Sequence, residues 1–184
     1  MKKITLILFA LFTCWQINAQ VSSYAFTELA GTYTENTAGA TTIAAVRADT
    51  FISTAQNIGF DFVYGGITYT QFKMSSNGFI SLNMTGTTSL TTNDLSADNA
   101  NSRPIIAPLW DDLDGATPTT SLASYELTGT APNRVLTVEW RNWEWNWDSG
   151  ATPVISFQVK LYETTNVIEF VYRQEATAVA SGSA

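Results

Sequence analysis

The sequence predicts an all-β fold, an antiparallel β-sandwich of about nine to eleven strands with no substantial helix in the mature chain. From Tyr24 onward the composition is rich in Thr, Ser, Ala, Asn, Gly and aromatic residues, as is typical of strands separated by turns. No apolar repeat at helical spacing extends over three turns. Parallel strands need crossover connections, which are usually helices, so we expect the strands to pair antiparallel.

Residues 1–19 have the features of a secretory signal peptide. Lys2 and Lys3 form a basic start, the apolar run Ile4 to Trp15 is too short to span a bilayer, and Ala19 is a small residue at the expected cleavage site. The alternative is a buried N-terminal helix. We expect cleavage after Ala19, one domain over residues 20–176, and a protein that is secreted or displayed at the cell surface.

The composition narrows the function classes. The sole cysteine, Cys14, lies in the predicted signal peptide, so the mature chain can form no disulfide and no thiolate metal site. The chain has no histidine, which removes the commonest general base and metal ligand, and its formal net charge is -7. Because an acidic surface repels phosphate backbones and anionic lipids, we expect no nucleic-acid partner and no membrane insertion after signal removal.

Five strands are expected before residue 85, and two glycine-containing turns join the last three of them into a meander. Gly65–Gly66 and Asn77–Gly78 supply the positive φ angles that tight hairpin turns require. The alternation of apolar residues is clearest on either side of these two turns. The expected strands are Tyr24–Tyr33, Ile43–Phe51, Ile58–Tyr64, Ile67–Met74 and Ile80–Met84.

Residues 85–103 are polar and predict a long surface loop, after which an apolar run ends in an acidic turn at residues 105–114. The remaining strands show the most regular alternation in the chain. They are expected at Ala123–Leu127, Arg134–Trp140, Ile155–Leu161 and Val167–Tyr172. Residues 177–184 form a tail, either a disordered end or the start of further sequence.

Several runs in this β-rich region resemble the nidogen-like extracellular domain. They are Phe60–Tyr69, Lys73–Leu82, Ile106–Asp112, Ala131–Arg134 leading to Val138–Trp140, and Ser156–Glu163 leading to Ile168–Phe170. They are also similar to the related N-terminal domains of secreted and cell-surface proteins of the Bacteroidetes type, which use type IX secretion. The resemblance covers most of residues 24–172 and implies a sandwich-like extracellular module with adhesive or scaffolding associations. It implies no catalytic residue.

The acidic turn is one candidate site. Asp111, Asp112 and Asp114 offer hard oxygen ligands close together, and Gly115 permits a sharp turn, as in a calcium loop. The twelve-residue spacing of a helix-loop-helix calcium site is absent. The alternative is a turn whose aspartates cap backbone N–H groups. We expect no required cofactor, and calcium is the one ion that these residues would suit.

A tryptophan-rich run is the other candidate site. In an extended chain, Trp143, Trp145 and Trp147 share one face, with Glu144 and Asn146 on the other. Indole faces beside polar acceptors are suited to stacking against sugars. The alternatives are packing in the core, or contact with a partner or a neighbouring domain.

These observations favour a non-catalytic module for adhesion or scaffolding within a larger extracellular protein. Its expected partners are an extracellular glycan or protein surface, or neighbouring domains of a longer chain. The alternative is a carbohydrate-binding module that uses the tryptophan stripe. Glu139 or Glu144 paired with an aspartate of the acidic turn would supply the two carboxylates of a glycosidase, but we expect no enzyme.

Overall fold

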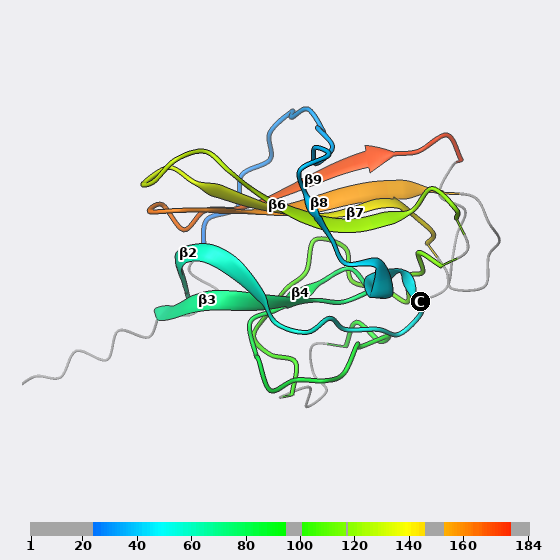
Figure 1. Ribbon diagram of the computed structural model, residues 1–184, viewed down its shortest axis with the longest axis horizontal. Coiled ribbons are helices and arrows are strands. Elements are labelled where there is room, and N and C mark those ends of the chain that lie inside the picture. The colour runs from blue at the N-terminus through cyan, green and yellow to red at the C-terminus, as the bar shows by residue number, and fades with distance from the viewer. Residues whose placement is uncertain (1–23, 95–100, 117, 146–152, 178–184) are drawn as a thin grey trace, which may run out of the picture.

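A computed structural model describes residues 24–94, 101–116, 118–145 and 153–177. The predicted signal peptide, Asn146, Trp147 and residues 178–184 lie outside the described residues. The structure contains two antiparallel sheets and one short 3-10 turn, which confirms the predicted all-β class and sandwich arrangement (Figure 1).

The five-stranded sheet has the order β1-β6-β7-β8-β9, and the four-stranded sheet has the order β2-β3-β4-β5. The strands are β1 (Thr41–Thr42), β2 (Gln56–Tyr64), β3 (Ile67–Met74), β4 (Ile80–Ser81), β5 (Ile105–Ile106), β6 (Leu122–Thr128), β7 (Val135–Trp143), β8 (Ile155–Tyr162) and β9 (Ile168–Gln174), and the 3-10 turn η2 spans Ala44–Arg47. All neighbouring strands run antiparallel.

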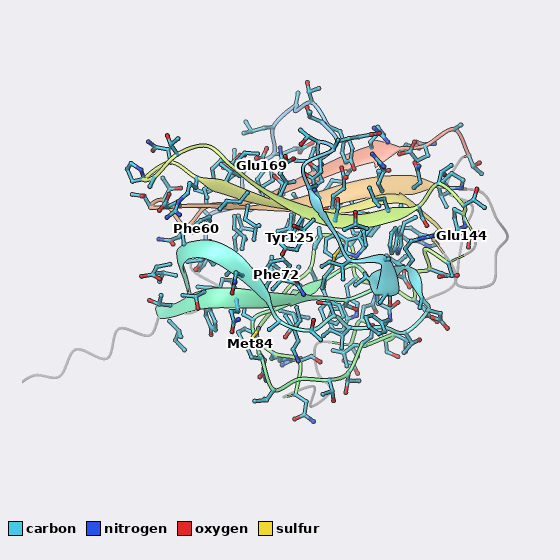
Figure 2. The ribbon with its side chains drawn as sticks, in the orientation of Figure 1. Phe60, Phe72, Met84, Tyr125, Glu144 and Glu169 are labelled. Carbon is cyan, nitrogen blue, oxygen red and sulfur yellow. The ribbon has the colours of Figure 1, made fainter. Side chains whose placement is uncertain are left out.

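The hydrophobic core lies between the two sheets and follows from alternation along β8 and along β7 as far as Trp140. Phe157, Val159 and Leu161 point inward from β8 and are fully buried. Figure 2 places Phe72 of β3 and Tyr125 of β6 between the layers, where their rings meet edge to face with centroids 5.4 Å apart. Such aromatic pairs stabilise a core beyond the area they bury.

The two predicted glycine-containing turns are present, although in the second only Gly78, and not Asn77, has a positive φ. Gly65 and Gly66 both have positive φ and connect β2 to β3. Gly78 has a φ of 73°, and a Cβ at this position would lie 1.7 Å from the carbonyl oxygen of Leu109. Only glycine satisfies both the backbone conformation and this close approach.

Three predicted strands differ from the structure. Residues 24–33 form no strand, because their attachment to the domain runs through side chains rather than through a backbone ladder. The stretch Ile43–Phe51 contains the 3-10 turn η2, where Val46 is buried. The strand expected at Ile80–Met84 is only two residues long, because the next residue, Leu82, faces Pro104, which accepts its N–H but has no N–H to return a bond.

Candidate functional site

The tryptophan run is preceded by a bulge in β7 that the sequence analysis did not predict. A bulge interrupts the β7–β8 register between Trp140 and Trp143, and Asn142 inside it has a φ of 58°. A bulge adds one residue to a strand and so reverses the faces that follow it. As a result, Trp140 and Trp143 both point into the core, and both are 0% exposed.

Both indoles are fixed by hydrogen bonds to the turn that follows β3. Trp140 Nε1 donates to the carbonyl of Ser75 at 2.8 Å, and Trp143 Nε1 donates to that of Ser76 at 3.0 Å. Trp140 also stacks on Phe157 with centroids 5.0 Å apart. Trp143 therefore offers no ring face to a sugar in this structure, whereas Trp145 is partly buried against the core.

Glu144 lies within the protein rather than on an exposed polar face. Its side chain is 1% exposed, and its backbone N–H donates to the carbonyl of Asp114 at 2.9 Å. This isolated bridge joins the end of β7 to the acidic turn. The structure therefore brings together the two candidate sites that the sequence suggested separately.

Two aspartates of the acidic turn, Asp111 and Asp114, bind backbone groups of the turn itself. Asp111 accepts a hydrogen bond from the N–H of Asp112 at 2.8 Å, and Asp114 accepts one from Ala116 at 2.6 Å. Asp111 and Asp114 are 7% and 4% exposed. Burial raises the pKa of Asp112, and the negative charges of Asp49, Asp111 and Asp114 raise it further.

Arg47 of η2 braces the residues that follow this turn. Its guanidinium donates to the carbonyls of Gly115 at 3.0 Å and Pro118 at 3.1 Å, and to Ser121 Oγ at 2.7 Å. Across the described ranges, no group of three or more His, Cys, Asp or Glu is placed to hold a metal ion. The contacts that the structure gives Asp111 and Asp114 are those of the capping alternative.

The contacts that sequence reasoning missed lie on the outer face of the five-stranded sheet, where Tyr33 and Asn36 bind Glu139. Glu139 of β7 is 0% exposed there, although it faces away from the core. Its Oε1 accepts hydrogen bonds from the hydroxyl of Tyr33 at 2.8 Å, Gln158 Nε2 at 2.8 Å and the backbone N–H of Asn36 at 3.2 Å. Burial raises the pKa of Tyr33, and the adjacent Glu139 carboxylate raises it further.

An ion-pair cluster fastens the same N-terminal segment. Glu35 binds Arg141 of β7 at 2.6 Å and Arg173 of β9 at 2.9 Å. The hydrogen bond from Arg173 is the main cause of the lowered pKa of Glu35. The Arg173 guanidinium also lies 4.5 Å from the ring centre of Tyr33. We call residues 33–37 the strap, because they cross the outer face and are held there by their polar groups (Figure 1).

The free edge of β9 is a further surface feature. Val167, Phe170 and Tyr172 are 52%, 38% and 48% exposed, respectively. β9 has β8 as its neighbour on one side and is the last strand of its sheet. Apolar side chains therefore lie beside an open strand edge.

Comparison with protein families identifies this arrangement. A family model described as NIDO related matches residues 23–184, which include every strand of both sheets. The chain belongs to the nidogen-related family. No curated protein and no solved structure matches the chain.

Membership of the nidogen-related family bears on compartment and chemistry at a coarse level. Nidogen-like domains are typically extracellular, and the family is generally a non-catalytic module. In the part of the chain that the structure describes, no helix is long and apolar enough to span a bilayer. The family match assigns no ligand and no binding residue.

Proposed function

We propose that this nidogen-related chain is a non-catalytic secreted or cell-surface module, which serves adhesion or scaffolding within a larger extracellular protein. The observation that carries the proposal is that buried carboxylates of this chain accept hydrogen bonds from groups of the fold itself. One oxygen of Glu139 accepts three hydrogen bonds, and Asp111 and Asp114 each accept one from a backbone N–H of their own turn. Groups so engaged stabilise the fold and are poorly placed to exchange protons with a substrate.

The partner that fits this proposal is an extracellular protein surface. Exposed apolar side chains include Phe26 and Leu29, which are 89% and 82% exposed, on a chain whose formal net charge is -7. Apolar side chains within a polar surround are typical of protein contact sites. The same net charge disfavours nucleic acid and anionic membranes as partners.

The glycan-binding alternative now depends on Trp145 among the described tryptophans of the run, since Trp140 and Trp143 are enclosed. A single partly buried indole offers less stacking area than a three-residue stripe. We therefore rank the protein surface first, and the experiment below separates the two.

Microspheres coated with the full chain test the adhesive role. They are passed under flow over immobilised fibronectin and collagen as protein surfaces, and over chitin and pectin as glycans, with heat-unfolded protein as the control. Retention on protein that requires the folded chain supports the proposal. Retention on glycan alone that is lost with Trp145→Ala supports the alternative. Absence of retention on every surface, or release of soluble sugar, overturns the adhesive role.

A further inference from the structure

The backbone of β9 has a row of hydrogen-bonding groups that point away from its sheet. Tyr162 N–H donates to Val167 O at 3.1 Å, and Glu175 N–H donates to Val154 O at 2.9 Å. Because direction alternates along a strand, the odd-numbered residues 167–175 face β8 and the even-numbered residues 168–174 face outward. Within the described ranges, no backbone group of another strand pairs with this outward row.

β9 differs from the other edges of the two sheets. β1 and β5 are only two residues long, and the β2 edge carries a register shift between Asn57 and Phe62. β9 pairs with β8 over seven consecutive residues without a shift, and it contains neither Pro nor Lys. Short length, bulges, Pro, Lys and other charged side chains keep edge strands from pairing with other chains. Of these, β9 has only the charged residues Glu169 and Arg173, which have opposite signs.

The side chains of β9 are self-complementary about Val171. In an antiparallel pairing with a two-fold axis at Val171, Glu169 lies opposite Arg173 of the second copy, and Phe170 lies opposite Tyr172 of the second copy. The outward backbone groups of Phe170 and Tyr172 then form the hydrogen-bonded pair, as the ladder geometry requires. We infer that this protein forms a symmetric homodimer in which β9 pairs with β9 of a second copy and the two five-stranded sheets become continuous.

Charge selects this register over its neighbours. Moving the axis by one residue in one direction sets Glu169 against Val171 of the second copy, and in the other direction against Glu175. The register that sets Glu169 opposite Val171 loses the charge pair. The register that sets Glu169 opposite Glu175 places two negative charges opposite each other, which destabilises a cross-strand pair. The chosen register satisfies both copies at once, as a two-fold interface must.

Glu169 and Arg173 are both held in place by other side chains on the outer side of the sheet. Figure 2 places Glu169 on the outer side of the five-stranded sheet, where it accepts a hydrogen bond from Tyr162. Within the described residues it forms no ion pair, although Lys160 is its register partner on β8. Arg173 is held in position by Glu35 at 2.9 Å and by Glu175 at 2.8 Å. A second copy therefore supplies Glu169 with a positioned cation.

The residues that precede the strap do not occupy the edge by pairing. Residues 24–32 connect Tyr24, which lies against Tyr64, to the strap on the outer face, and every one of them is exposed. Across the described ranges, none of them is hydrogen-bonded to β9. Among the residues that the structure describes, the outward row thus has no backbone partner.

Sedimentation velocity of the full chain over a wide concentration range tests the dimer. Glu169→Lys sets two cations opposite each other at both Glu169–Arg173 contacts of the dimer, so we expect the dissociation constant to rise about tenfold or more. Asp61→Lys makes the same charge change on an exposed residue of the bulged β2 edge and should leave dimerisation unchanged. Phe170→Pro removes an outward N–H while sparing the bonds to β8 and should yield monomer.

The outcomes separate cleanly. A concentration-dependent dimer that Glu169→Lys weakens and Asp61→Lys preserves establishes the β9 interface, even if Phe170→Pro does not fold. A monomer at every concentration, or a dimer indifferent to Glu169→Lys, overturns it. The inference goes beyond the proposed adhesive role and does not depend on it, because a chain that binds no surface can still dimerise.

Discussion

Replacing Trp143 by Ala is the most informative single change, because it decides between a core residue and a ligand platform. Trp143 is 0% exposed, and its Nε1 donates to Ser76 O at 3.0 Å. A Cβ placed on Gly115 would lie 2.6 Å from its ring, so the indole is packed directly on the backbone of the acidic turn. Removal of the indole opens a cavity between the end of β7 and the acidic turn, which contact each other through that ring.

The expected cost follows from this burial. Truncating a fully buried tryptophan to Ala lowers the free energy of unfolding by about 3–5 kcal/mol. For a domain of this size each kcal/mol lowers the melting temperature by about 2–4 °C, so we expect a fall of about 6–20 °C. The stability of a domain is commonly about 5–15 kcal/mol, so this change consumes a large share of it.

Thermal unfolding followed by near-ultraviolet circular dichroism measures the effect, with two matched variants. Trp143→Phe keeps an aromatic ring and loses the bond to Ser76, so it should fall between wild type and Trp143→Ala. Trp145→Ala changes a partly buried ring in the same run and should cost less. A Trp143→Ala protein that melts within about 2 °C of wild type, yet loses glycan binding, would refute the core assignment.

Four further results are expected. Tyr33→Phe removes a donor to a buried carboxylate and should cost about 1.5–3 kcal/mol by urea unfolding, while Tyr24→Phe at an exposed contact should cost much less. Gly78→Ala should cost more than about 1 kcal/mol, whereas Gly31→Ala, which meets nothing within 4 Å, should be nearly neutral; equal effects would contradict the close approach. Hydrogen bonding from Arg134 lowers the pKa of Glu163 from 4.5 to about 2. The stability that this carboxylate contributes is therefore present above pH 4.5 and is lost as the pH falls toward 2, and Glu163→Gln should flatten that part of the curve of stability against pH. Calcium should leave the melting temperature unchanged relative to chelator, since the acidic turn is internally bonded; a calcium site saturated at 100 times its dissociation constant would add about 2.7 kcal/mol.

The strands whose faces differ most in polarity could be predicted from the sequence. In β8 the inward Phe157, Val159 and Leu161 alternate with Ser156 and Gln158, so one register fits the core and the other does not. The glycine turns were equally predictable, because positive φ angles are costly for other residues. Both features depend only on residues that are close together in the sequence.

The burial of Trp143 on the same side as Trp140 could not be predicted, because one backbone conformation decides it. Asn142 adopts a positive φ, which residues other than glycine seldom do, and the bulge it belongs to turns Trp143 into the core. Asn is among the residues that tolerate this conformation, so its presence inside a run of alternating tryptophans was the available signal.

The N-terminal segment was wrongly predicted as a strand for a different reason. Its aromatic and polar residues satisfy the pattern of a strand, but its partners are side chains about a hundred residues away in the sequence. Polar residues at Glu139, Arg141 and Gln158 marked the outward face of their strands, yet nothing in the sequence indicated that Tyr33 and Glu35 would cover them.

The strap has a consequence for when the chain can finish folding. Glu35 and its partner Arg173 are separated by 138 positions, and Tyr33 and Glu139 by 106. Contacts between such distant positions form late and slow the folding rate, because a long loop must close before they contribute. During synthesis the strap therefore cannot complete its contacts with the sheet until β9, which carries Arg173, has emerged from the ribosome.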